Sequence, residues 1–325
     1  MTEAALGQVA GALAQEWRSL LGRAALRHVF LSPAWLRAWW EEFGQGEPLL
    51  VAARKDGALM GIAPFMKQGD SLTFAGDPNV CDYMDFTLAA DAAREALGAL
   101  WRSLMAHDWR ELVLWGLPED SPTLQALPGL AREDGLDAQE EREDVCPVLD
   151  LPPRWEEYLE SLPGKDRHEL LRKLRRLYRV GEPSLETLAT PEETAAGVDD
   201  FLHLHRISRP DKARFMSESM ARFFRRMVAY LSEEGWVRLY FLRLGQVRAA
   251  ALLCFVNGDT LQLYNSGYDP AYAHLSVGLL SKALLVEHAI EAGFRRLDFL
   301  RGAEPYKYDL GARDVVVYRL RVRRG

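Results

Sequence analysis

A short stretch of charged and aromatic residues follows the apolar segment "RRLDFL" near the end of the chain. Asp298 interrupts that segment, and a buried charge is costly unless it is paired. Asp298 is therefore either an anchor for a basic group such as Arg301 or a base in a cleft, and we favour the anchor. Gly302 allows the backbone to turn. Lys307 follows between two tyrosines, and an ammonium group there can stabilise negative charge that develops on a carbonyl oxygen.

A second charged feature is the strongly basic segment 165–179. It contains seven Lys or Arg and only two acids, Asp166 and Glu169, while leucines recur at helical spacing. The pattern predicts a helix with one packed stripe and a basic remainder. That remainder is either a solvated face or a phosphate-binding surface for CoA, a nucleotide-linked sugar, a lipid headgroup or tRNA. The basic surface extends into what we expect to be a flexible, lid-like loop, through Arg206, Arg209, Lys212 and Arg214.

Several kinds of chemistry have no sequence signal. The chain has no GxxxxGK[ST], GxGxxG, HExxH or GxSxG motif. His203 and His205 are two residues apart on a predicted helix, which makes them a poor metal pair. We therefore expect no metal site. A transferase that binds two substrates and needs little protein chemistry remains open.

Composition sets broad limits on the chain. It has 325 residues, 48% of them hydrophobic and 27% charged, with a formal net charge of −7. These values predict a folded globular protein of about two domains and argue against a protein that coats nucleic acid. Three dispersed cysteines predict no disulfide framework, and no uncharged run is long enough to span a membrane. We expect a cytoplasmic protein, and the sequence predicts no particular oligomeric state.

Helix and strand signals alternate in a regular order. Ser32-Pro33 predicts the start of a helix whose tryptophans, spaced helically, belong to the core. Thr190-Pro191 with Glu193 predicts a capping box at another helix start. Each half of the chain then reads as helix, three strands joined by glycine-containing turns, helix and strand.

The two halves repeat one another. Gly69-Asp70 corresponds to Gly258-Asp259, and "ALGALWRSLMAHDWRELVLWG" corresponds to "SKALLVEHAIEAGFRRLDFLRG". We therefore predict a mixed α+β fold of two tandem domains, 1–150 and 151–325, each with a mostly antiparallel mixed sheet and flanking helices.

Residues 264–312 resemble a known family. The segment "YNSGYDPAYAHLSVGLLSKALLVEHAIEAGFRRLDFLRGAEPYKYDLGA" resembles GNAT-type acyltransferases of the CelD-like and FemAB-like group. The segments "DRHELLRKLRRLYR", "FLHLHRISR" and "CDYMDF" resemble other parts of that group. The resemblance implies tandem GNAT domains, the first of them degenerate, with the second binding the acyl donor.

The resemblance also implies where the donor binds. In a GNAT fold the fourth strand splays from the fifth, and the donor pyrophosphate lies on the start of the following helix, where free N–H groups and the helix dipole attract an anion. In this sequence that helix start is "HLSVG", with Ser276 expected as the side-chain cap. The predicted donor-binding residues are Asn265, Ser266, His274, Ser276, Val277 and Gly278.

The remaining roles rest on the same resemblance. Lys307 would stabilise the substrate's phosphate or carbonyl, Glu304 would relay the amine proton, and Tyr268 or Tyr306 would protonate a departing thiolate. Together with Asp298 these are the predicted catalytic residues. The predicted substrate-binding residues are Asp82, Tyr83, Asp85, Arg206, Arg209 and Arg301.

The function implied is transfer of an acyl group, most simply acetyl from acetyl-CoA or another acyl-CoA co-substrate, to an amino group. The acceptor would be a sugar, an amino acid or a cell-envelope precursor. Two alternatives stay open: a FemAB-like transferase that uses aminoacyl-tRNA bound by the basic helix 165–179, and a non-catalytic binding protein with a GNAT fold.

Overall fold

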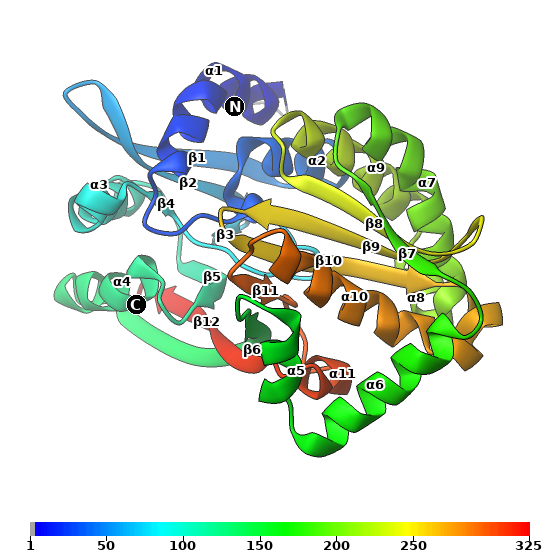
Figure 1. Cartoon of the computed structure of the whole chain (residues 1–325). Helices are drawn as coiled ribbons and strands as arrows, with labels where there is room; N and C mark the ends of the chain where they lie inside the picture. The colour runs from blue at the N-terminus through cyan, green and yellow to red at the C-terminus, as the bar shows by residue number, and fades with distance from the viewer. Residues whose placement is uncertain (1–3) are drawn as a thin grey trace. The chain divides into compact units, whose positions relative to one another are not determined.

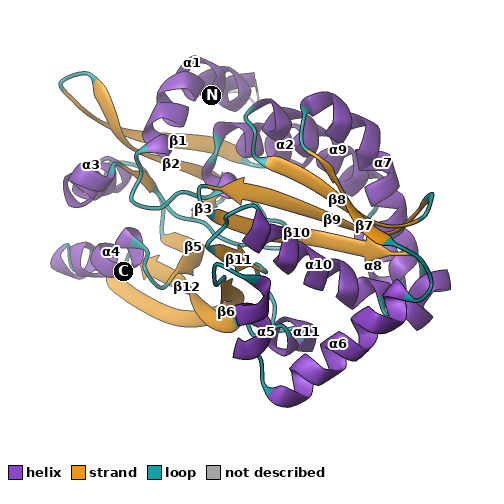
Figure 2. Cartoon of the chain, in the orientation of Figure 1, coloured by secondary structure: helices purple, strands orange, loops and turns teal. Residues whose placement is uncertain are grey.

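The computed structural model describes the backbone of residues 4–325 and the side chains from residue 13 onward. Helices and strands alternate along the chain, as Figure 2 shows by colour, and the fold is the mixed one that the sequence predicts. The chain forms two compact units. Unit 1 comprises residues up to 145 together with 315–325, and unit 2 comprises residues 146–314.

Unit 1 begins with helices α1 (Ala4–Gly22) and α2 (Pro33–Phe43). Ser32 caps α2 through its hydroxyl, which accepts a hydrogen bond of 3.1 Å from the N–H of Trp35, and Pro33 occupies the first turn, as predicted. The tryptophans of α2 are at most 9% exposed, which confirms that they belong to the core.

The sheet of unit 1 starts with an antiparallel meander of β1 (Glu47–Lys55), β2 (Ala58–Gln68) and β3 (Ser71–Phe74). Helix α3 (Ala93–Met105) then leads to β5 (Glu111–Pro118), which pairs parallel to β3. The short strand β4 (Thr87–Leu88) pairs with β2, and α4 (Pro122–Glu133) follows β5.

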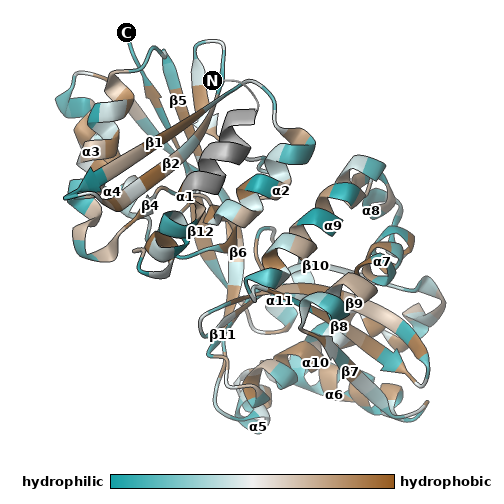
Figure 3. Ribbon diagram, turned by 90° about the horizontal axis from the view of Figure 1, so that it is seen from above, coloured by the Kyte–Doolittle hydropathy of each residue, from teal (hydrophilic) through white to brown (hydrophobic). Residues whose placement is uncertain are grey.

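Unit 2 has more helices before its sheet. These are α5 (Trp155–Ser161), α6 (Gly164–Tyr178), α7 (Pro191–Ser208), α8 (Pro210–Phe215) and α9 (Glu218–Glu233), with strand β7 (Pro183–Leu188) between α6 and α7. The capping box of Thr190 and Glu193 is present at the start of α7. Figure 3 shows both hydrophilic and hydrophobic stretches on α9, as expected of a helix that packs along one face.

The sheet of unit 2 repeats the pattern of unit 1. Strands β8 (Val237–Leu244), β9 (Val247–Asn257) and β10 (Thr260–Tyr268) form an antiparallel meander, to which β7 adds at the β8 edge. Helix α10 (Val277–Glu291) leads to β11 (Arg296–Asp298), which pairs parallel to β10. Helix α11 (Pro305–Asp309) and strand β12 (Arg313–Arg323) complete the chain, as Figure 1 shows.

The predicted duplication is visible in single hydrogen bonds. Gly69 and Gly258 both have a positive φ, of 60° and 61°, at the turn before the third strand of each meander. The carbonyl of Asp70 accepts from the N–H of Arg110 at 2.8 Å, and the carbonyl of Asp259 accepts from the N–H of Arg295 at the same distance. Each half of the chain therefore builds its parallel strand pair in the same register.

Helices cover both faces of the sheet in unit 2. Leu252 and Cys254 of β9 belong to one core together with α6 and α10. Phe255, which alternates with them, contacts Tyr264, and Tyr264 stacks on Phe224 of α9. A helix layer on each face holds β10 and β11 firmly, and the candidate site is built on these strands.

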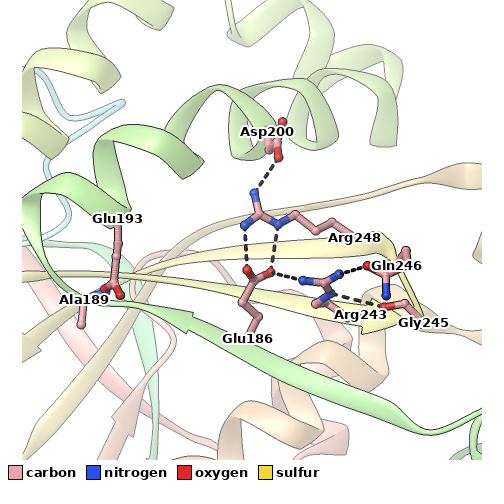
Figure 4. A network of polar contacts seen from close by, with 8 residues as sticks. All are labelled: Glu186, Ala189, Glu193, Asp200, Arg243, Gly245, Gln246 and Arg248. Atoms are coloured by element: carbon pink, nitrogen blue, oxygen red, sulfur yellow. Dashed lines mark hydrogen bonds and ion pairs between the residues drawn. The ribbon is translucent and has the colours of Figure 1, made fainter.

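A charged network fixes the edge strand β7 to its neighbours (Figure 4). Arg248 of β9 donates to both carboxylate oxygens of Glu186 of β7, at 2.8 and 2.9 Å, and to Asp200 of α7 at 2.6 Å. Arg243 of β8 also reaches Glu186, at 3.6 Å. A two-pronged arginine–carboxylate pair of this kind fixes orientation as well as distance.

The chain crosses between the units within two strands, β6 (Asp137–Asp150) and β12. Residues 148–150 of β6 pair with β11, and residues 317–323 of β12 pair with β5. The division therefore differs from the contiguous domains 1–150 and 151–325 expected from the sequence. The difference arises because the last strand closes the sheet of the first unit.

Two further observations concern the described residues as a whole. The three cysteines are free and buried. No helix in the part of the chain that the structure describes is both long and apolar enough to cross a membrane.

Candidate active site

The candidate site begins where β10 and β11 separate. Their parallel pairing covers only Thr260–Gln262 against Arg296–Asp298, while β10 continues to Tyr268. The space beyond the last pair is a cavity of about 560 Å³. Because β11 ends at the last pair, β10 has an open side there, where the resemblance implies the donor, and the cavity lies beside it.

Most of the predicted donor-site and catalytic residues meet at this cavity. From the predicted donor site, Asn265, Ser266, Ser276 and Gly278 line it. From the predicted catalytic set, Tyr268, Glu304, Tyr306 and Lys307 line it. Arg209 and Arg301 of the predicted substrate-binding set also contribute to the lining.

Strand β10 contains a β-bulge at the point where it lines the cavity. The register against β9 shifts between Leu263 and Asn265, so that Tyr264 is an extra residue without a Cα partner. Asn265 then lies 2.9 Å from Nε2 of His205 on α7, through its amide oxygen. Burial is the main cause that lowers the pKa of His205 to about 4, with the charge of Lys212 adding to it, so this imidazole is neutral at pH 7.

Helix α7 packs unusually close to β10. A Cβ atom on Gly267 would lie 2.3 Å from the backbone nitrogen of His205. Only glycine allows the two backbones to approach so closely. This contact fixes the position of β10 at the edge of the cavity.

The start of α10 faces the same cavity. The N–H groups of Leu279 and Leu280 both bond to the carbonyl of Ser276, at 3.0 and 2.9 Å. The N–H groups of Val277 and Gly278 come earlier in the first turn, where a helix offers no internal acceptor. Gly278 also leaves room for Tyr268, because a Cβ atom there would lie 2.9 Å from the tyrosine ring. The geometry is that of an anion-binding helix terminus.

The expectation that Ser276 caps this helix with its side chain is wrong. Ser276 adopts a left-handed conformation, with φ of 60°, and its hydroxyl makes no capping bond. The hydroxyl instead accepts a hydrogen bond of 2.9 Å from the guanidinium of Arg176. A cation therefore takes the place of the cap beside the free N–H groups.

Arg176 comes from the basic helix α6, and this contact connects two features that the sequence presents separately. The leucine stripe of α6 is buried, at Leu170, Leu174 and Leu177, as its spacing predicts. Among the described residues, Nε of Arg176 has no hydrogen-bond partner although it is buried. An unpartnered guanidinium nitrogen next to a helix start suits a phosphate group.

Two predicted donor-site residues make no side-chain contribution to the cavity. His274 is exposed, and its Nδ1 lies 3.1 Å from the carbonyl of Ala271. Val277 is fully buried. Neither side chain is among those that line the cavity.

Lys307 is tied to the loop that follows β11. Its ammonium donates to the carbonyls of Leu300, Arg301 and Gly302 at 2.8–3.0 Å and lies 2.9 Å from the carboxylate of Glu304. The side chain is 2% exposed. These four oxygens satisfy the three N–H groups of the Lys307 ammonium, so the main role of Lys307 in this structure is to stabilise the loop. Its predicted role at a substrate carbonyl stays a prediction.

Asp298 supports the same loop from the other side. It is 4% exposed, and it accepts hydrogen bonds of 2.8 Å from the N–H of Leu300 and of 3.4 Å from the amide of Gln262. Leu300 has a φ of 56°, a strained conformation for leucine. Asp298 does not line the cavity. These bonds hold the loop after β11, and the predicted pairing of Asp298 with a basic group stays a prediction.

Glu304 and Tyr306 have opposite protonation states at neutral pH. Burial alone would raise the pKa of Glu304, but the hydrogen bond and charge of Lys307 outweigh it and lower that pKa. Glu304 is therefore ionised. Burial raises the pKa of Tyr306, so its phenol keeps its proton.

Two lysines outside the predicted catalytic and binding sets also line the cavity, and of these Lys212 belongs to the predicted basic surface. Lys282 of α10 is 6% exposed, and its ammonium donates to the carbonyl of Gly278 at 2.7 Å and lies 4.9 Å from the ring centre of Tyr306. Lys212 of α8 donates to the carbonyl of Ser266. A signal for Lys282 exists, since it is the one charge between Val277 and Val286 in an otherwise apolar run.

The segment around Arg206 and Arg209 is more ordered than expected. Residues Pro210–Phe215 form helix α8 in place of a flexible loop. Arg209 lines the cavity and pairs with Asp211 at 2.8 Å. Arg206 turns away, to the carbonyl of Met216 and to Glu218 at 3.0 and 2.9 Å.

The predicted acidic substrate site of unit 1 is differently built. Residues 82–86 are irregular in place of the expected strand. Tyr83 is 3% exposed and stacks on His28 with ring centres 4.4 Å apart. Asp85 is fully buried, and its carboxylate accepts from the N–H of Phe86 at 2.6 Å. Asp82 is half-buried. The burial of Tyr83 and Asp85 closes both to a substrate in this structure.

No group of three or more His, Cys, Asp or Glu side chains is placed to hold a metal ion within the described part of the chain. The residues that line the cavity supply a helix start, two guanidinium groups, three ammonium groups, one ionised carboxylate and three phenols.

Comparisons with known proteins identify the family of the domain that contains this cavity. Residues 164–308 match the family model described as "Acetyltransferase (GNAT) domain". The comparison with curated proteins found no match.

Solved structures show a similar fold over nearly the whole chain. The crystal structure of FemX is 13% identical, with a TM-score of 0.64, over 94% of this chain and 95% of that chain. The C-terminal domain of a putative lysylphosphatidylglycerol synthetase from Agrobacterium fabrum is 12% identical, with a TM-score of 0.60, over 97% and 92%. L-PGS from Bacillus licheniformis is 12% identical, with a TM-score of 0.57, over 94% and 90%. At such identities the likeness shows the fold alone.

The family match covers the whole of the cavity lining described above, from Arg209 to Lys307. The resemblance to GNAT acyltransferases is thereby confirmed, and residues 164–308 form a GNAT domain, the domain of an N-acyltransferase.

Proposed function

We propose that unit 2 transfers an acyl group from an acyl-CoA thioester, most simply acetyl-CoA, to the amino group of a small acceptor. The observation that carries the proposal is the start of α10, which meets Arg176 at the open end of β10. The acceptor class is an amino sugar, an amino acid or a cell-envelope precursor.

The phosphates of the donor would bind where positive groups converge. The N–H groups of Val277 and Gly278 and the guanidinium of Arg176 form one cluster. Beyond Gln262, β10 has no strand partner on the side of β11 in the described structure. The backbone groups of Leu263–Tyr268 can therefore bond to the amides of the pantetheine arm, as an added strand does.

The chemical step needs two proton transfers. The acceptor amine attacks the thioester carbonyl, forming the C–N bond, and the C–S bond then breaks. Glu304 is ionised and accepts the proton that the amine loses, directly or through water. Tyr306 is protonated and, like Tyr268, lines the cavity, so either phenol can return a proton to the thiolate. Asp298 and Lys307 position the loop between these groups.

A second candidate donor is aminoacyl-tRNA. The observation that favours it is the exposed basic surface of α6 and its C-cap, which includes Lys165, Arg175 and Arg179. Nucleic-acid binding through such a surface weakens steeply as salt rises, whereas binding of CoA depends on only a few charges.

The donor can be identified by thermal stability and transfer assays. We would measure the melting temperature with CoA, acetyl-CoA, UDP-amino sugars and tRNA, and follow thiol release from acetyl-CoA with a panel of amines. We expect CoA to stabilise the protein. In the variant Arg176→Met, the KM for acetyl-CoA should rise about tenfold, the effect of losing one charge-assisted hydrogen bond. Arg225→Met, which removes an exposed arginine of α9 paired with Asp199, is the control.

Two outcomes would count against the proposal. If tRNA but not CoA stabilises the protein, and the effect disappears between 50 and about 200 mM salt, the donor is aminoacyl-tRNA. If no donor binds, the fold serves as a binding module.

A further inference from the structure

The cavity of unit 2 carries an excess of positive charge. Lys212, Lys282 and Lys307 come from three different helices, and Glu304 is the one acid among the described residues that line it. Glu304 and Lys307 neutralise one another, because their charged atoms lie 2.9 Å apart. Lys212 and Lys282 then remain without a carboxylate partner inside the cavity.

The three ammonium groups differ in how well they are satisfied. Lys307 is surrounded by four oxygens. Lys282 donates to one acceptor among the described residues, the carbonyl of Gly278, and Lys212 likewise donates to one, the carbonyl of Ser266. An ammonium has three N–H donors, so two on each of these lysines are left for a ligand.

Burial makes this arrangement unfavourable in the empty protein. Burial lowers the pKa of Lys282 to about 7, and the charge of Lys212 is the next cause. Burial likewise lowers the pKa of Lys212 to about 8, followed by the charge of Arg209. A buried and a half-buried cation that repel one another destabilise a fold, and such pairs concentrate at functional sites.

The remaining neighbours do not supply the missing negative charge. Arg209 adds a further cation, and its partner Asp211 is held at 2.8 Å by that arginine. Cys254 of β9 is close enough to Lys282 to interact with its charge, but burial raises the pKa of the Cys254 thiol, so the thiol is neutral. Tyr306 is neutral for the same reason. An anionic ligand is the group that would complete this part of the cavity.

We propose that the cavity binds a carboxylate of the substrate between Lys212 and Lys282, so that the enzyme acts on a carboxylate-bearing substrate. A carboxylate has two oxygens and can accept from both ammonium groups at once. The phosphates of the donor have their own place at the start of α10, next to Arg176. Lys282 lies one turn further into that helix and points to the interior of the cavity.

The carboxylate can come from either substrate of the proposed transfer, on which this assignment rests. It can belong to the acyl group, as in succinyl-CoA, or to the acceptor, as in an amino acid. The two sources share one recognition chemistry and are separated by matched pairs of ligands that differ in a carboxylate.

The test is a calorimetric binding experiment on the full chain. The donor pair is succinyl-CoA and acetyl-CoA, and the acceptor pair is L-lysine and cadaverine, measured with and without CoA. We expect the carboxylate-bearing member of one pair to bind at least about tenfold more tightly than its partner. That advantage should fall to within about twofold in Lys282→Met and in Lys212→Met, and persist in Lys55→Met, which alters an exposed lysine of unit 1.

A second measurement is the number of protons taken up when the ligand binds, and it does not depend on turnover. A carboxylate beside Lys282 raises its pKa again, so binding at pH 8 should take up protons. Calorimetry in two buffers of different ionisation enthalpy measures this uptake, which should fall in Lys282→Met, where Lys212, with a pKa of about 8, is the lysine of the pair that can still take up a proton. The groups that face Lys282 are Lys212, Cys254, Glu304, Tyr306 and Lys307.

The proposal is overturned if neither pair shows a carboxylate preference, or if the preference survives in both lysine variants. Circular dichroism of Lys282→Met and Lys212→Met checks that each variant is folded. Failure of the acyl-CoA proposal gives a different result: acetyl-CoA and succinyl-CoA both fail to bind, while the preference for L-lysine over cadaverine can still be measured.

Discussion

The two units contain the same parallel strand pair, but the space beside that pair is packed with aromatic rings in unit 1 and is a cavity in unit 2. In unit 1, Phe74 ends β3 and packs against the rings of Phe65, Phe86 and Trp115, with ring centres 5.9–6.1 Å apart. The position equivalent to Phe74 in unit 2 is Leu263, which lines a cavity of about 560 Å³. Aromatic packing fills one copy, and the other copy keeps an open space lined by charges.

The helices that follow these strands, α3 and α10, differ in the charge of the side chains at their N-termini. The start of α3 carries Glu95 in its first turn and Asp91 just before it, and these carboxylates pair with Lys55 and Arg23. The start of α10 carries no acid and receives Arg176. Acids at a helix start satisfy the dipole and repel an anion, whereas an arginine there attracts one. The comparison favours unit 2 as the donor-binding copy and a structural role for unit 1.

The largest expected effect comes from removing the aromatic packing of unit 1. Phe74→Ala should lower the free energy of unfolding by about 3–5 kcal/mol, since the residue is fully buried among three rings. Urea unfolding followed by tryptophan fluorescence measures the change. Tyr178→Ala, at a residue 53% exposed, should change stability by less than about 0.5 kcal/mol. A loss below 1 kcal/mol for Phe74→Ala would mean that the packing is dispensable.

Lys307→Met should have the next largest effect on stability. It removes the cation that three loop carbonyls and Glu304 share, and we expect a loss of about 2–4 kcal/mol. Lys173→Met, at a lysine paired with Glu169 on α6, is the control. Normal stability combined with lost turnover would instead support a direct role of Lys307 at the substrate.

Lys282→Met should stabilise the empty protein. The lysine has a folded pKa of about 7, below the value of about 10.4 in an unfolded chain, so the unfolded state holds more protons between these pH values. Wild-type stability therefore rises with pH across that range, and the destabilisation is fully present below pH 7. We expect the variant to be more stable by about 1–3 kcal/mol at pH 6, with the difference shrinking toward pH 10. An advantage independent of pH would show that Lys282 is not a strained cation.

The smallest expected effect concerns the helix starts. Glu95→Gln should lower stability by about 0.5 kcal/mol at low salt, through the dipole of α3 and its exposed pair with Lys55. Glu133→Gln, in the last turn of α4, should have the opposite sign. The difference between the two variants should fade in 1 M salt. If both variants changed stability equally, the charges at the helix termini would not account for the difference between α3 and α10.

Local patterns predict much of the candidate site. Residues 264–278 and 298–307 meet because each segment lies at one end of a strand in the same parallel pair, which follows from the predicted order of elements. The capping of α2 and α7 is also local, and both caps are present. The spacing of leucines in α6 predicts its buried stripe.

What the sequence does not predict depends on contacts between distant residues. The hydroxyl of Ser276 turns to Arg176 because α6 packs beside α10, and no local pattern contains that contact. Lys282 lies in an apolar run that reads as core, and only the fold opens a cavity beside it. Tyr83 and Asp85 alternate like a strand, yet packing against His28 and the loop around them buries both.

The return of β12 to the first unit has a consequence for how the protein is made. Leu114 of β5 pairs with Leu320, so the sheet of unit 1 lacks a strand until residues 317–323 have left the ribosome. Unit 2, whose residues 146–314 are contiguous, has all of its strands earlier. Synthesis therefore reverses the usual order, in which the N-terminal part folds first. During that interval β5 is an exposed edge, a surface on which chaperones and aggregation compete.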